Sequence, residues 1–458
     1  MLSFEEIFER QKAYFATGRT RSFEWRKAQL SSLEALLREN EGAFYEALGM
    51  DFKKAAFEQY MEVHGPLATI ANVLQNLQQW MEPETAEIPG GLAASGHQGK
   101  IFYEPYGVTL VIGPFNAPLI LLFEPVIAAL SAGNTVIAKP SEATSYTSEL
   151  LLQLVPKYFE AEVFALVAGA KEAVIDLLAL PFDFIAFTGS EKVGKIVMRA
   201  AAEHLTPVLL ELGGQNCAVV DETASIEHAA TQLAWGATAI SGQWCVSPGY
   251  VFVHSSVAGK FVQACKTALL EMYGSDARSS PDYSRMKSPD DVRRIAQMTA
   301  GASVAYGGRF DVADCYIEPT IIYPARRDEP AMCGEIFGPV LPVLPYDDLQ
   351  EVIQFISAKP KALAGYMFSN NAENVQTFLD GVSFGGGCVN NTNIHCWLGG
   401  LPFGGVGPSG IGKYFGKHSF TTFSNRKSML LSPSEQLLKS LYPPYSPEKL
   451  GELGSLLS

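Results

Sequence analysis

The first eighty residues carry apolar side chains at helical spacing. In the second helical segment, Leu30, Leu33 and Leu37 fall on one face, and the charged residues fall on the opposite face. Residues 81–99 are instead rich in proline and glycine, which predicts a loop or an exposed excursion. The start of the chain is therefore predicted to be helical and to end in a break.

From residue 107 onward, short continuous apolar runs alternate with segments of helical periodicity. The alternation resumes after Asp221, with a helix expected over residues 225–240 and a strand over residues 250–254. Continuous apolar strands that alternate with helices are typical of a parallel sheet covered on both faces. The pattern predicts an α/β fold. The first five predicted strands span residues 107–113, 134–140, 163–169, 182–189 and 208–214.

An uncharged stretch over residues 105–123 resembles a membrane span in composition. Its centre, however, contains Pro114, Asn116 and Pro118, and Glu124 follows it. Prolines and a polar residue at the centre disfavour a membrane-spanning helix. We interpret the stretch as a buried strand, a polar turn and a buried helix, so no membrane partner is expected.

Length and composition limit the classes of protein that fit. A chain of 458 residues favours two or three domains over a single core. Its 34 basic and 48 acidic residues give a net charge of −14, which disfavours nucleic acid and anionic membranes as partners. The seven cysteines show no CxxC spacing and the acidic N-terminus lacks a signal-peptide pattern, so a cytoplasmic location is expected.

Ligands of open α/β sheets bind at the carboxyl ends of the strands, and two such turns carry suitable residues. At the first, Gly189 and Ser190 end a strand, and Gly194 lies early in the next helix. The free N–H groups there suit a phosphate, although the spacing is not GxGxxG and an ordinary turn is an equal alternative. At the second, Lys139 can donate to ribose oxygens and Glu142 can accept from ribose hydroxyls. A solvated loop with an N-cap serine is the alternative there.

A carboxylate and a thiol occupy two further breaks in the pattern. Glu211 ends an apolar strand before a glycine pair, where burial would raise its pKa and suit it to act as a general base. A strand-end salt bridge is the alternative. Cys245 lies in SGQWCVSPGY, between a predicted helix and a predicted strand. A thiolate attacks carbonyl carbons, and a positive partner or oriented N–H groups lower its pKa from about 8.5.

The remaining cysteines lie mostly in helical or apolar segments, where burial as a small apolar residue is the default. Cys388 and Cys396 lie near His395 in the sequence. Their spacing fits no common zinc pattern, so no metal site is predicted.

Six motifs occur in the order found in the aldehyde dehydrogenase superfamily, which the chain resembles from about residue 4 to 430. The C-terminal segment LPFGGVGPSGIGKYFGKHSFTTFSNRKS and the short chain look most like the class 3 branch. The motifs are GPFNAP, IAKPSE, FTGSEKVG, LELGGQN, GQWCVSP and EIFGPVLPV.

The resemblance implies an α/β architecture with a Rossmann-type cofactor domain, an α/β catalytic domain and a small oligomerisation element. It also implies a homodimer. The expected NAD(P)-binding domain comprises residues 1–82 and 103–210, the catalytic domain 211–390, the oligomerisation element 83–102 and 391–430, and a C-terminal arm 431–458.

The resemblance also assigns roles to individual residues. It makes Cys245 the nucleophile, Glu211 the general base and Asn116 the amide that stabilises the oxyanion. NAD is the expected cofactor because a carboxylate at the ribose repels a 2′-phosphate, although the class 3 branch often accepts NADP as well. The implied cofactor contacts are Lys139 and Glu142 at the adenosine ribose, Gly189, Ser190 and Gly194 near the pyrophosphate, Leu212 and Gly213 beside the nicotinamide ring, and Glu335 and Phe337 at the nicotinamide ribose.

The implied activity is the oxidation of an aldehyde to a carboxylic acid through a thiohemiacetal and a thioester, which water then hydrolyses. Related enzymes of this fold transfer the acyl group to another acceptor or act on semialdehydes, and both are kept as alternatives. A cofactor-binding protein without turnover is the alternative from another class. Aromatic, medium-chain aliphatic and semialdehyde substrates are all compatible with the sequence.

Four positions depart from the pattern of the superfamily. Gln215 replaces a common lysine, Ala117 replaces a frequent aromatic residue, and Gly249 replaces a frequent aspartate. Trp244 is unusual immediately before the expected nucleophile. These departures bear on substrate choice more than on the chemistry.

Overall fold

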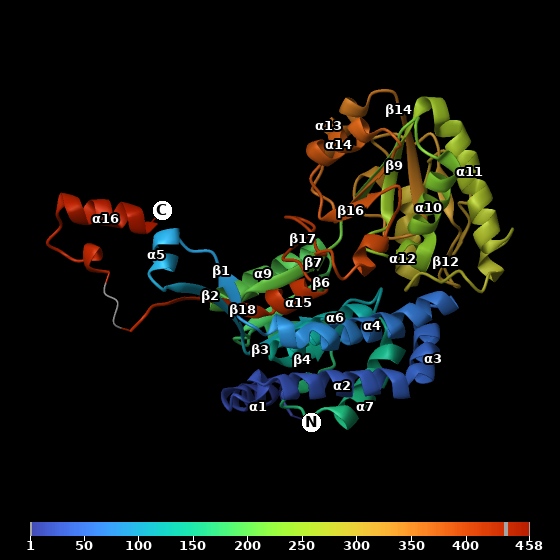
Figure 1. The fold of residues 1–458 in the computed structure, drawn as a ribbon. Helices are drawn as coiled ribbons and strands as arrows, with labels where there is room; N and C mark the ends of the chain where they lie inside the picture. Colours follow the sequence, from blue (N-terminus) through green and yellow to red (C-terminus); the bar gives the residue numbers. More distant parts are fainter. Residues whose placement is uncertain (1, 435–437, 458) are drawn as a thin grey trace.

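Two open α/β sheets form the body of the molecule, and a small third sheet lies at its edge (Figure 1). The structure is a computed structural model that describes residues 2–434 and 438–457. The predicted C-terminal arm over 431–458 is thus described except for residues 435–437 and 458.

Helices fill the first eighty residues, as predicted. Ser3 begins α1 with a capping box, because its hydroxyl accepts from the Glu6 N–H while the Glu6 carboxylate accepts from the Ser3 N–H. Leu30, Leu33 and Leu37 are all fully buried. The four α-helices are α1 (Phe4–Ala16), α2 (Phe23–Glu39), α3 (Glu41–Asp51) and α4 (Ala56–Trp80).

The first sheet follows the predicted alternation of strands and helices. Its order is β17-β7-β6-β3-β4-β5, and all neighbours are parallel except β17 and β7. Helices cover both faces, which explains why the strands are continuously apolar. The strands are β3 (Val108–Ile112), β4 (Thr135–Lys139), β5 (Phe164–Leu166), β6 (Phe184–Gly189), β7 (Val208–Leu212) and β17 (Gly410–Ile411), and the helices are α6 (Ile120–Ala132), α7 (Ser145–Tyr158), α8 (Lys171–Leu178) and α9 (Glu191–His204).

The strand order of this sheet reverses between β3 and β6. The chain begins at β3, moves outward through β4 and β5, and then returns to β6 on the other side of β3. Loops that leave β3 and β6 therefore diverge, and such a reversal creates the crevice in which α/β sheets bind ligands. The predicted turns at Asn116 and Gly189 both follow these two strands.

The uncharged stretch over 105–123 divides as predicted into the end of β2, strand β3, a turn and the start of α6. Pro114 and Pro118 lie in the turn. Within residues 2–434 and 438–457, no helix is both long and apolar enough to cross a membrane.

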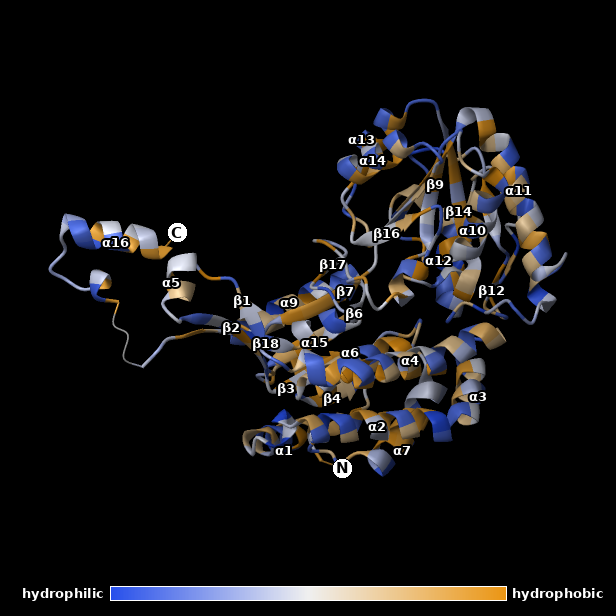
Figure 2. Ribbon diagram, in the orientation of Figure 1, coloured by the Kyte–Doolittle hydropathy of each residue, from blue (hydrophilic) through white to orange (hydrophobic). Residues whose placement is uncertain are grey.

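The second sheet has seven strands in the order β10-β13-β14-β9-β8-β15-β16, all parallel except the edge strand β10. Figure 2 shows hydrophilic and hydrophobic residues alternating along helices such as α11, as expected for helices with one buried face. The strands are β8 (Asn216–Val220), β9 (Pro248–His254), β10 (Val304–Tyr306), β13 (Thr320–Ile322), β14 (Val340–Tyr346), β15 (Ala364–Phe368) and β16 (Gly386–Val389), and the helices are α10 (Ile226–Thr238), α11 (Ser255–Tyr273), α12 (Pro289–Thr299), α13 (Leu349–Ser357) and α14 (Ala372–Gly381).

The segment predicted as an exposed loop, residues 81–99, contains regular structure. It holds β1 (Glu84–Ala86), α5 (Gly90–Ala94) and the start of β2 (Gln98–Pro105). The loop alternative was wrong because β1 pairs with β2, which pairs over its whole length with β18 (Ser424–Leu431), a strand more than 300 residues later. The alternative of an exposed excursion agrees with the structure, since none of residues 81–96 is buried. This sheet and helix α16 (Pro447–Leu457), which lies against α5, project from the body (Figure 1).

Candidate active site

Cys245 lies where two cavities meet. One cavity, of about 340 Å³, is mostly apolar and is called the apolar cavity below. The other, of about 400 Å³, lies at the strand reversal of the first sheet and is called the crevice. Cys245 lines both cavities. Of the twelve predicted site residues, the crevice is lined by Asn116, Lys139, Glu142, Gly189, Ser190, Glu211, Leu212, Gly213, Cys245, Glu335 and Phe337.

Gly194 is the predicted residue that does not line the crevice. It lies inside α9, where an added Cβ would come within 2.6 Å of a Leu212 methyl group. Glycine is therefore needed for close packing of the helix on β7. At the start of the same helix, Ser190 is the N-cap, and its hydroxyl accepts from the Val193 N–H at 3.4 Å.

Cys245 lies in a loop between the 3₁₀ helix η2 (Ala239–Gly242) and β9. Gly242 has a φ of +70°, which other residues rarely adopt, and a side chain there would collide with the Gly338 carbonyl. Both the backbone conformation and the close contact therefore require glycine. Because Cys245 lies outside any helix, its backbone N–H is not used internally, and it makes no hydrogen bond within the described residues. This N–H is free to bind a ligand atom.

Glu211 is buried at the end of β7 and makes contact with the Cys245 thiol. Burial raises the pKa of Glu211 to about 8, the negative Glu335 raises it further, and the thiol contact acts in the opposite direction. The elevated pKa is what the sequence predicted. One Glu211 carboxyl oxygen has no partner among the described residues, which disfavours the alternative of a strand-end salt bridge.

The surroundings of Cys245 raise the pKa of its thiol, whereas a positive partner would have lowered it. Burial raises the pKa of the thiol well above its usual value, and the neighbouring Glu211, Cys396 and Glu335 raise it further. These neighbours lie far from Cys245 along the chain, so local sequence could not show that they are acids and a thiol instead of a cation. A thiol in these surroundings keeps its proton until a base accepts it, and the adjacent Glu211 is the nearest such group.

Glu335 and Gly213 fit together on the crevice wall. The Gly214 N–H donates to the Glu335 carboxylate, and burial raises the pKa of Glu335 to about 7. A Cβ at position 213 would collide with this carboxylate. Phe337 lies nearby with its ring edge-on to Phe115, the two centroids 5.8 Å apart.

Lys139 and Glu142 form an ion pair at the opposite part of the crevice. Lys139 is only 3% exposed in its side chain, whereas Glu142 is 57% exposed. A buried ammonium group, an exposed carboxylate and the N-terminus of the 14-residue helix α9 thus face one crevice. These groups fit a dinucleotide, because hydroxyls and phosphates need both donors and acceptors.

Asn116 and Ala117 face different cavities. Asn116 is buried on the crevice side, and its side-chain amide donates no hydrogen bond within the described part of the chain. Ala117 lines the apolar cavity, where its small side chain leaves space. The Asn116 amide is therefore a second unused donor beside Cys245.

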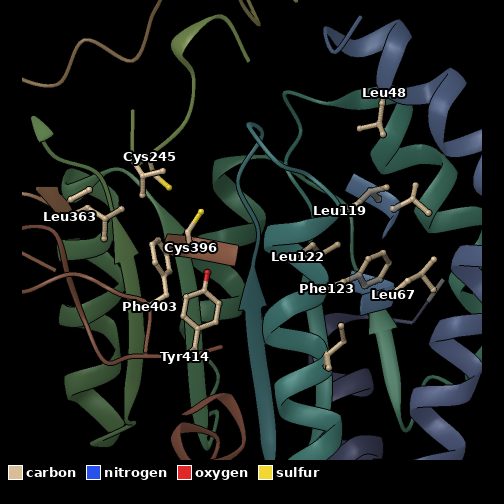
Figure 3. Close-up of a cluster of buried hydrophobic side chains, with 14 of the residues drawn as sticks. Leu48, Leu67, Leu119, Leu122, Phe123, Cys245, Leu363, Cys396, Phe403 and Tyr414 are labelled. Atoms are coloured by element: carbon tan, nitrogen blue, oxygen red, sulfur yellow. The ribbon is translucent and has the colours of Figure 1, made fainter. Parts of the chain in front are cut away.

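Three tryptophans form one wall of the apolar cavity. Trp244 stacks on Trp397 with centroids 5.4 Å apart, and both meet Trp235 edge-on. Cys396 also lines this cavity, and Figure 3 shows its sulfur pointing toward that of Cys245. The position of Trp244 explains one of the unusual residues noted in the sequence.

A buried ion pair also contributes to the apolar cavity. The Lys53 ammonium lies 3.1 Å from a Glu62 carboxyl oxygen, and both side chains are almost fully buried. The other Glu62 oxygen accepts from the backbone N–H groups of Leu119 and Ile120 at the start of α6. Neither this pair nor Trp235 was predicted from the sequence. Glu62 and Trp235 lie inside helices and Lys53 lies between α3 and α4, so only the rarity of a buried lysine could have indicated the pair.

The Gln215 and Gly249 departures are linked. The Gln215 side chain accepts from Lys359 at 2.6 Å and donates to the Ala331 carbonyl at 2.7 Å. A Cβ at Gly249 would come within 2.9 Å of the Gln215 side chain. The absence of a side chain at 249 therefore gives Gln215 room to bind the segment that leads to Glu335.

His395 and Cys388 lie close together, with Nδ1 and Sγ 3.7 Å apart. Burial lowers the pKa of His395 to about 4, and the nearby Lys413 lowers it further. In the ranges that the structure describes, no group of three or more His, Cys, Asp or Glu side chains is arranged to hold a metal ion.

Comparison with known proteins identifies the family. The sequence profile described as the aldehyde dehydrogenase family matches residues 3–429, so the chain belongs to this family. Human aldehyde dehydrogenase family 3 member B1 is 41% identical over 448 residues, which cover 97% of this chain and 95% of the human protein. The rat protein named aldehyde dehydrogenase, dimeric NADP-preferring, is 39% identical over 455 residues, covering 98% of this chain and 99% of the rat protein.

Among solved structures, the substrate-bound state of Staphylococcus aureus AldH matches with a TM-score of 0.96 and 38% identity, and the match covers 100% of both chains. The predicted fold, family and likeness to the class 3 branch are confirmed. Membership in this family makes the chain an oxidoreductase, as the sequence predicted.

Proposed function

We propose that the protein oxidises an uncharged apolar aldehyde to the carboxylic acid with NAD or NADP. The observation that carries this proposal is the position of Cys245 at the junction of the crevice and the apolar cavity. A bound aldehyde in the apolar cavity reaches the thiol from one side, and a nicotinamide in the crevice reaches it from the other.

In the first step, the Cys245 sulfur attacks the aldehyde carbon and Glu211 accepts the thiol proton. Their direct contact supports this assignment. The Cys245 N–H and the Asn116 amide, both without partners, donate to the new oxyanion. The cofactor supplies the hydride acceptor that turns the thiohemiacetal into a thioester. Glu211 then passes the thiol proton to solvent, and its carboxylate removes a proton from water. The resulting hydroxide attacks the thioester carbon and releases the acid, and the departing Cys245 thiolate takes the proton back from Glu211.

Hydrolysis is favoured over transfer to another acyl acceptor because Glu211 is present, buried and unpaired with any cation among the described residues. Enzymes of this fold that transfer the acyl group resolve the thioester without such a base. Retention of the thiol, the carboxylate and the amide around one space also opposes a non-catalytic cofactor-binding role.

The walls of the apolar cavity favour a substrate without a free carboxylate. Its cation, Lys53, is already neutralised by Glu62, and Glu58 and Asp282 add two further acidic groups to the lining. A semialdehyde with a carboxylate tail would lose hydration without gaining a counterion. The tryptophan wall instead offers apolar area and ring faces.

We further propose that residues 1–82 and 103–210 bind the cofactor and that residues 211–390 form the catalytic domain. The break between β7 in the first sheet and β8 in the second supports this division. The same proposal includes a cytoplasmic homodimer in which residues 83–102, 391–430 and the arm contribute contacts; the seven free cysteines support a reducing location.

A panel of aldehydes, followed at 340 nm with each cofactor, tests the function. We expect aromatic and long-chain aldehydes to be oxidised with a kcat/KM at least about tenfold above that of carboxylate-bearing semialdehydes. With NAD the kcat/KM should exceed that with NADP, because Glu142 lies in the crevice. Reduction of neither cofactor by any aldehyde would support the non-catalytic alternative, and a clear NADP preference would refute the role of Glu142.

Replacing Asn116 with alanine or aspartate should lower kcat about 100-fold, because either change removes one of the two oxyanion donors. The aspartate keeps the size of the side chain, so it separates loss of the donor from loss of packing. Steady-state rates and a titration of the cofactor by fluorescence measure the two effects. An unchanged kcat in Asn116→Asp would exclude the amide from oxyanion binding.

A further inference from the structure

Four consecutive carbonyl groups of the loop that holds Cys245 are fixed by hydrogen bonds. We call residues 243–247 the nucleophile loop. The Ser247 N–H donates to the Trp244 carbonyl at 2.9 Å. The Asn216 amide donates to the Cys245 and Ser247 carbonyls, both at 2.8 Å. The Tyr366 hydroxyl donates to the Val246 carbonyl at 2.6 Å.

The two side chains that hold the loop are themselves rigidly placed. Asn216 begins β8 and Tyr366 lies on the neighbouring strand β15, and both are buried in the second sheet. The Asn216 side-chain oxygen accepts from the Ala364 N–H at 2.8 Å, which ties it to β15 as well. The amide of Asn216 thus uses its oxygen for the sheet and its two donors for the loop.

The register of the sheet brings Asn216 to this position. The pairing of β8 with β9 shifts between Asn216 and Cys217, so Gly249 is an extra residue in β9 at this point. Immediately before this shift, the Asn216 amide binds the carbonyls of the segment that leads into β9. The Gly249 departure therefore belongs to the same local arrangement.

We propose that Asn216 and Tyr366 are positioning residues that hold the Cys245 sulfur and its free N–H in the geometry needed for attack on the aldehyde. This inference rests on the proposed function. Only two backbone dihedrals separate the Cys245 N–H from the Cys245 carbonyl, so fixing the carbonyls of residues 245–247 restricts the direction of that N–H. Neither side chain lines the crevice or the apolar cavity, so both act through the backbone that they bind. Asn216 holds the nucleophile loop and β15, and the Tyr366 hydroxyl, besides donating to the loop, accepts from the Asn393 N–H at 3.3 Å.

The matched control is Asn134, a buried asparagine with the same set of contacts elsewhere. Its side-chain nitrogen donates to the Ala129 and Phe423 carbonyls, and its oxygen accepts from the Gly107 N–H. Asn134 precedes β4, at the end of the first sheet opposite the crevice. A change of asparagine to serine at 134 or at 216 removes equivalent hydrogen bonds, but only the change at 216 releases the nucleophile loop.

The test compares Asn216→Ser, Tyr366→Phe and Asn134→Ser in the full chain. We expect Asn216→Ser to lower the acylation rate between about 10- and 100-fold, the effect of a misplacement near 1 Å, with the aldehyde KM and the cofactor Kd changed less than about threefold. Tyr366→Phe, which removes one oxygen atom and is the safer change for folding, should show the same pattern with a decrease of about three- to tenfold. Asn134→Ser should lose thermal stability while keeping its acylation rate.

Alkylation of Cys245 by iodoacetamide, followed by mass spectrometry of its peptide, gives a readout that needs no turnover. The buried thiol of the wild type should react slowly, and Asn216→Ser should react at least about fivefold faster because its loop is released. Equal acylation and alkylation rates in Asn216→Ser and Asn134→Ser would overturn the inference while leaving the proposed function intact. A wild type that oxidises no aldehyde would refute the proposed function instead, and alkylation would still decide whether Asn216 holds the loop.

Discussion

Replacing Cys245 with alanine is expected to lower aldehyde oxidation by at least about 10⁴-fold, because the covalent thiohemiacetal and thioester can no longer form. The six other cysteines do not substitute for it, although Cys396 shares the apolar cavity. Stopped-flow absorbance at 340 nm should show neither a burst nor a steady rate. Cofactor binding should persist, since the residues proposed to bind the ribose and phosphates are other residues of the crevice.

The control for this change is Cys265→Ala. Cys265 is a fully buried thiol in α11 that donates to the Ala230 carbonyl, and it lines neither cavity. The same chemical change there should cost some stability and leave kcat within about twofold. A Cys245→Ala enzyme that still reduced the cofactor at the wild-type rate would refute the covalent mechanism and the whole site assignment with it.

Replacing Glu211 with glutamine should separate the two halves of the reaction. Water can no longer lose its proton to the carboxylate, so steady-state turnover should fall about 10³-fold. An acyl-enzyme should accumulate on Cys245, visible by mass spectrometry as a mass increase on its peptide. A slower burst of one equivalent of reduced cofactor per site is expected before turnover stops. A variant with full steady-state activity would contradict the role of Glu211 as the base.

The pH dependence follows from the elevated pKa of Glu211, about 8. The base works only when ionised, so the rate of thioester hydrolysis in the wild type should rise with pH and level off above about 8. Glutamine does not titrate, and the residual rate of Glu211→Gln should lack this transition. Pre-steady-state rates between pH 6 and 10 measure both profiles.

Stability should change with pH in the opposite direction. The folded state holds the Glu211 proton up to about pH 8, while the unfolded carboxyl loses it near 4.5. The wild type therefore loses stability as pH rises from about 4.5 through 8, by as much as about 1.4 kcal/mol per pH unit from this one group. Glu211→Gln escapes that loss, so its melting temperature relative to the wild type should increase over this range.

Glu124 provides the matched control for both effects. It is also buried, and burial raises the pKa of Glu124 to about 8, but it lies inside α6 and accepts from the Thr69 hydroxyl instead of facing a cavity. Glu124→Gln should share the gain in stability at high pH and should keep full turnover. Accumulation of an acyl-enzyme in Glu124→Gln would show that loss of any buried carboxyl group slows hydrolysis. The kinetic effect of Glu211→Gln would then not depend on the position of Glu211 beside Cys245.

The sequence alone predicted the alternation of strands and helices that forms the first sheet, because strands buried on both faces are continuously apolar and the helices that cover them are amphipathic. It also predicted the residues that follow those strands, and eleven of the twelve predicted site residues line one crevice. Gly194 differs because a glycine at this position allows α9 to pack closely on Leu212. The spacing of residues along the sequence does not reveal this contact. The sequence did not predict most strands of the second sheet.

Only the tertiary structure decided the features that depend on partners far away in the chain. Strand β2 forms because β18 pairs with it. The high pKa of Cys245 arises first from burial and then from Glu211, which comes from another strand. The contacts of Asn216 with the nucleophile loop likewise depend on how β8 and β9 pair. The local pattern of hydrophobic and polar residues indicates which face of a helix or strand is buried. A hydrogen bond or a pKa shift depends instead on the particular groups that folding brings within a few ångströms.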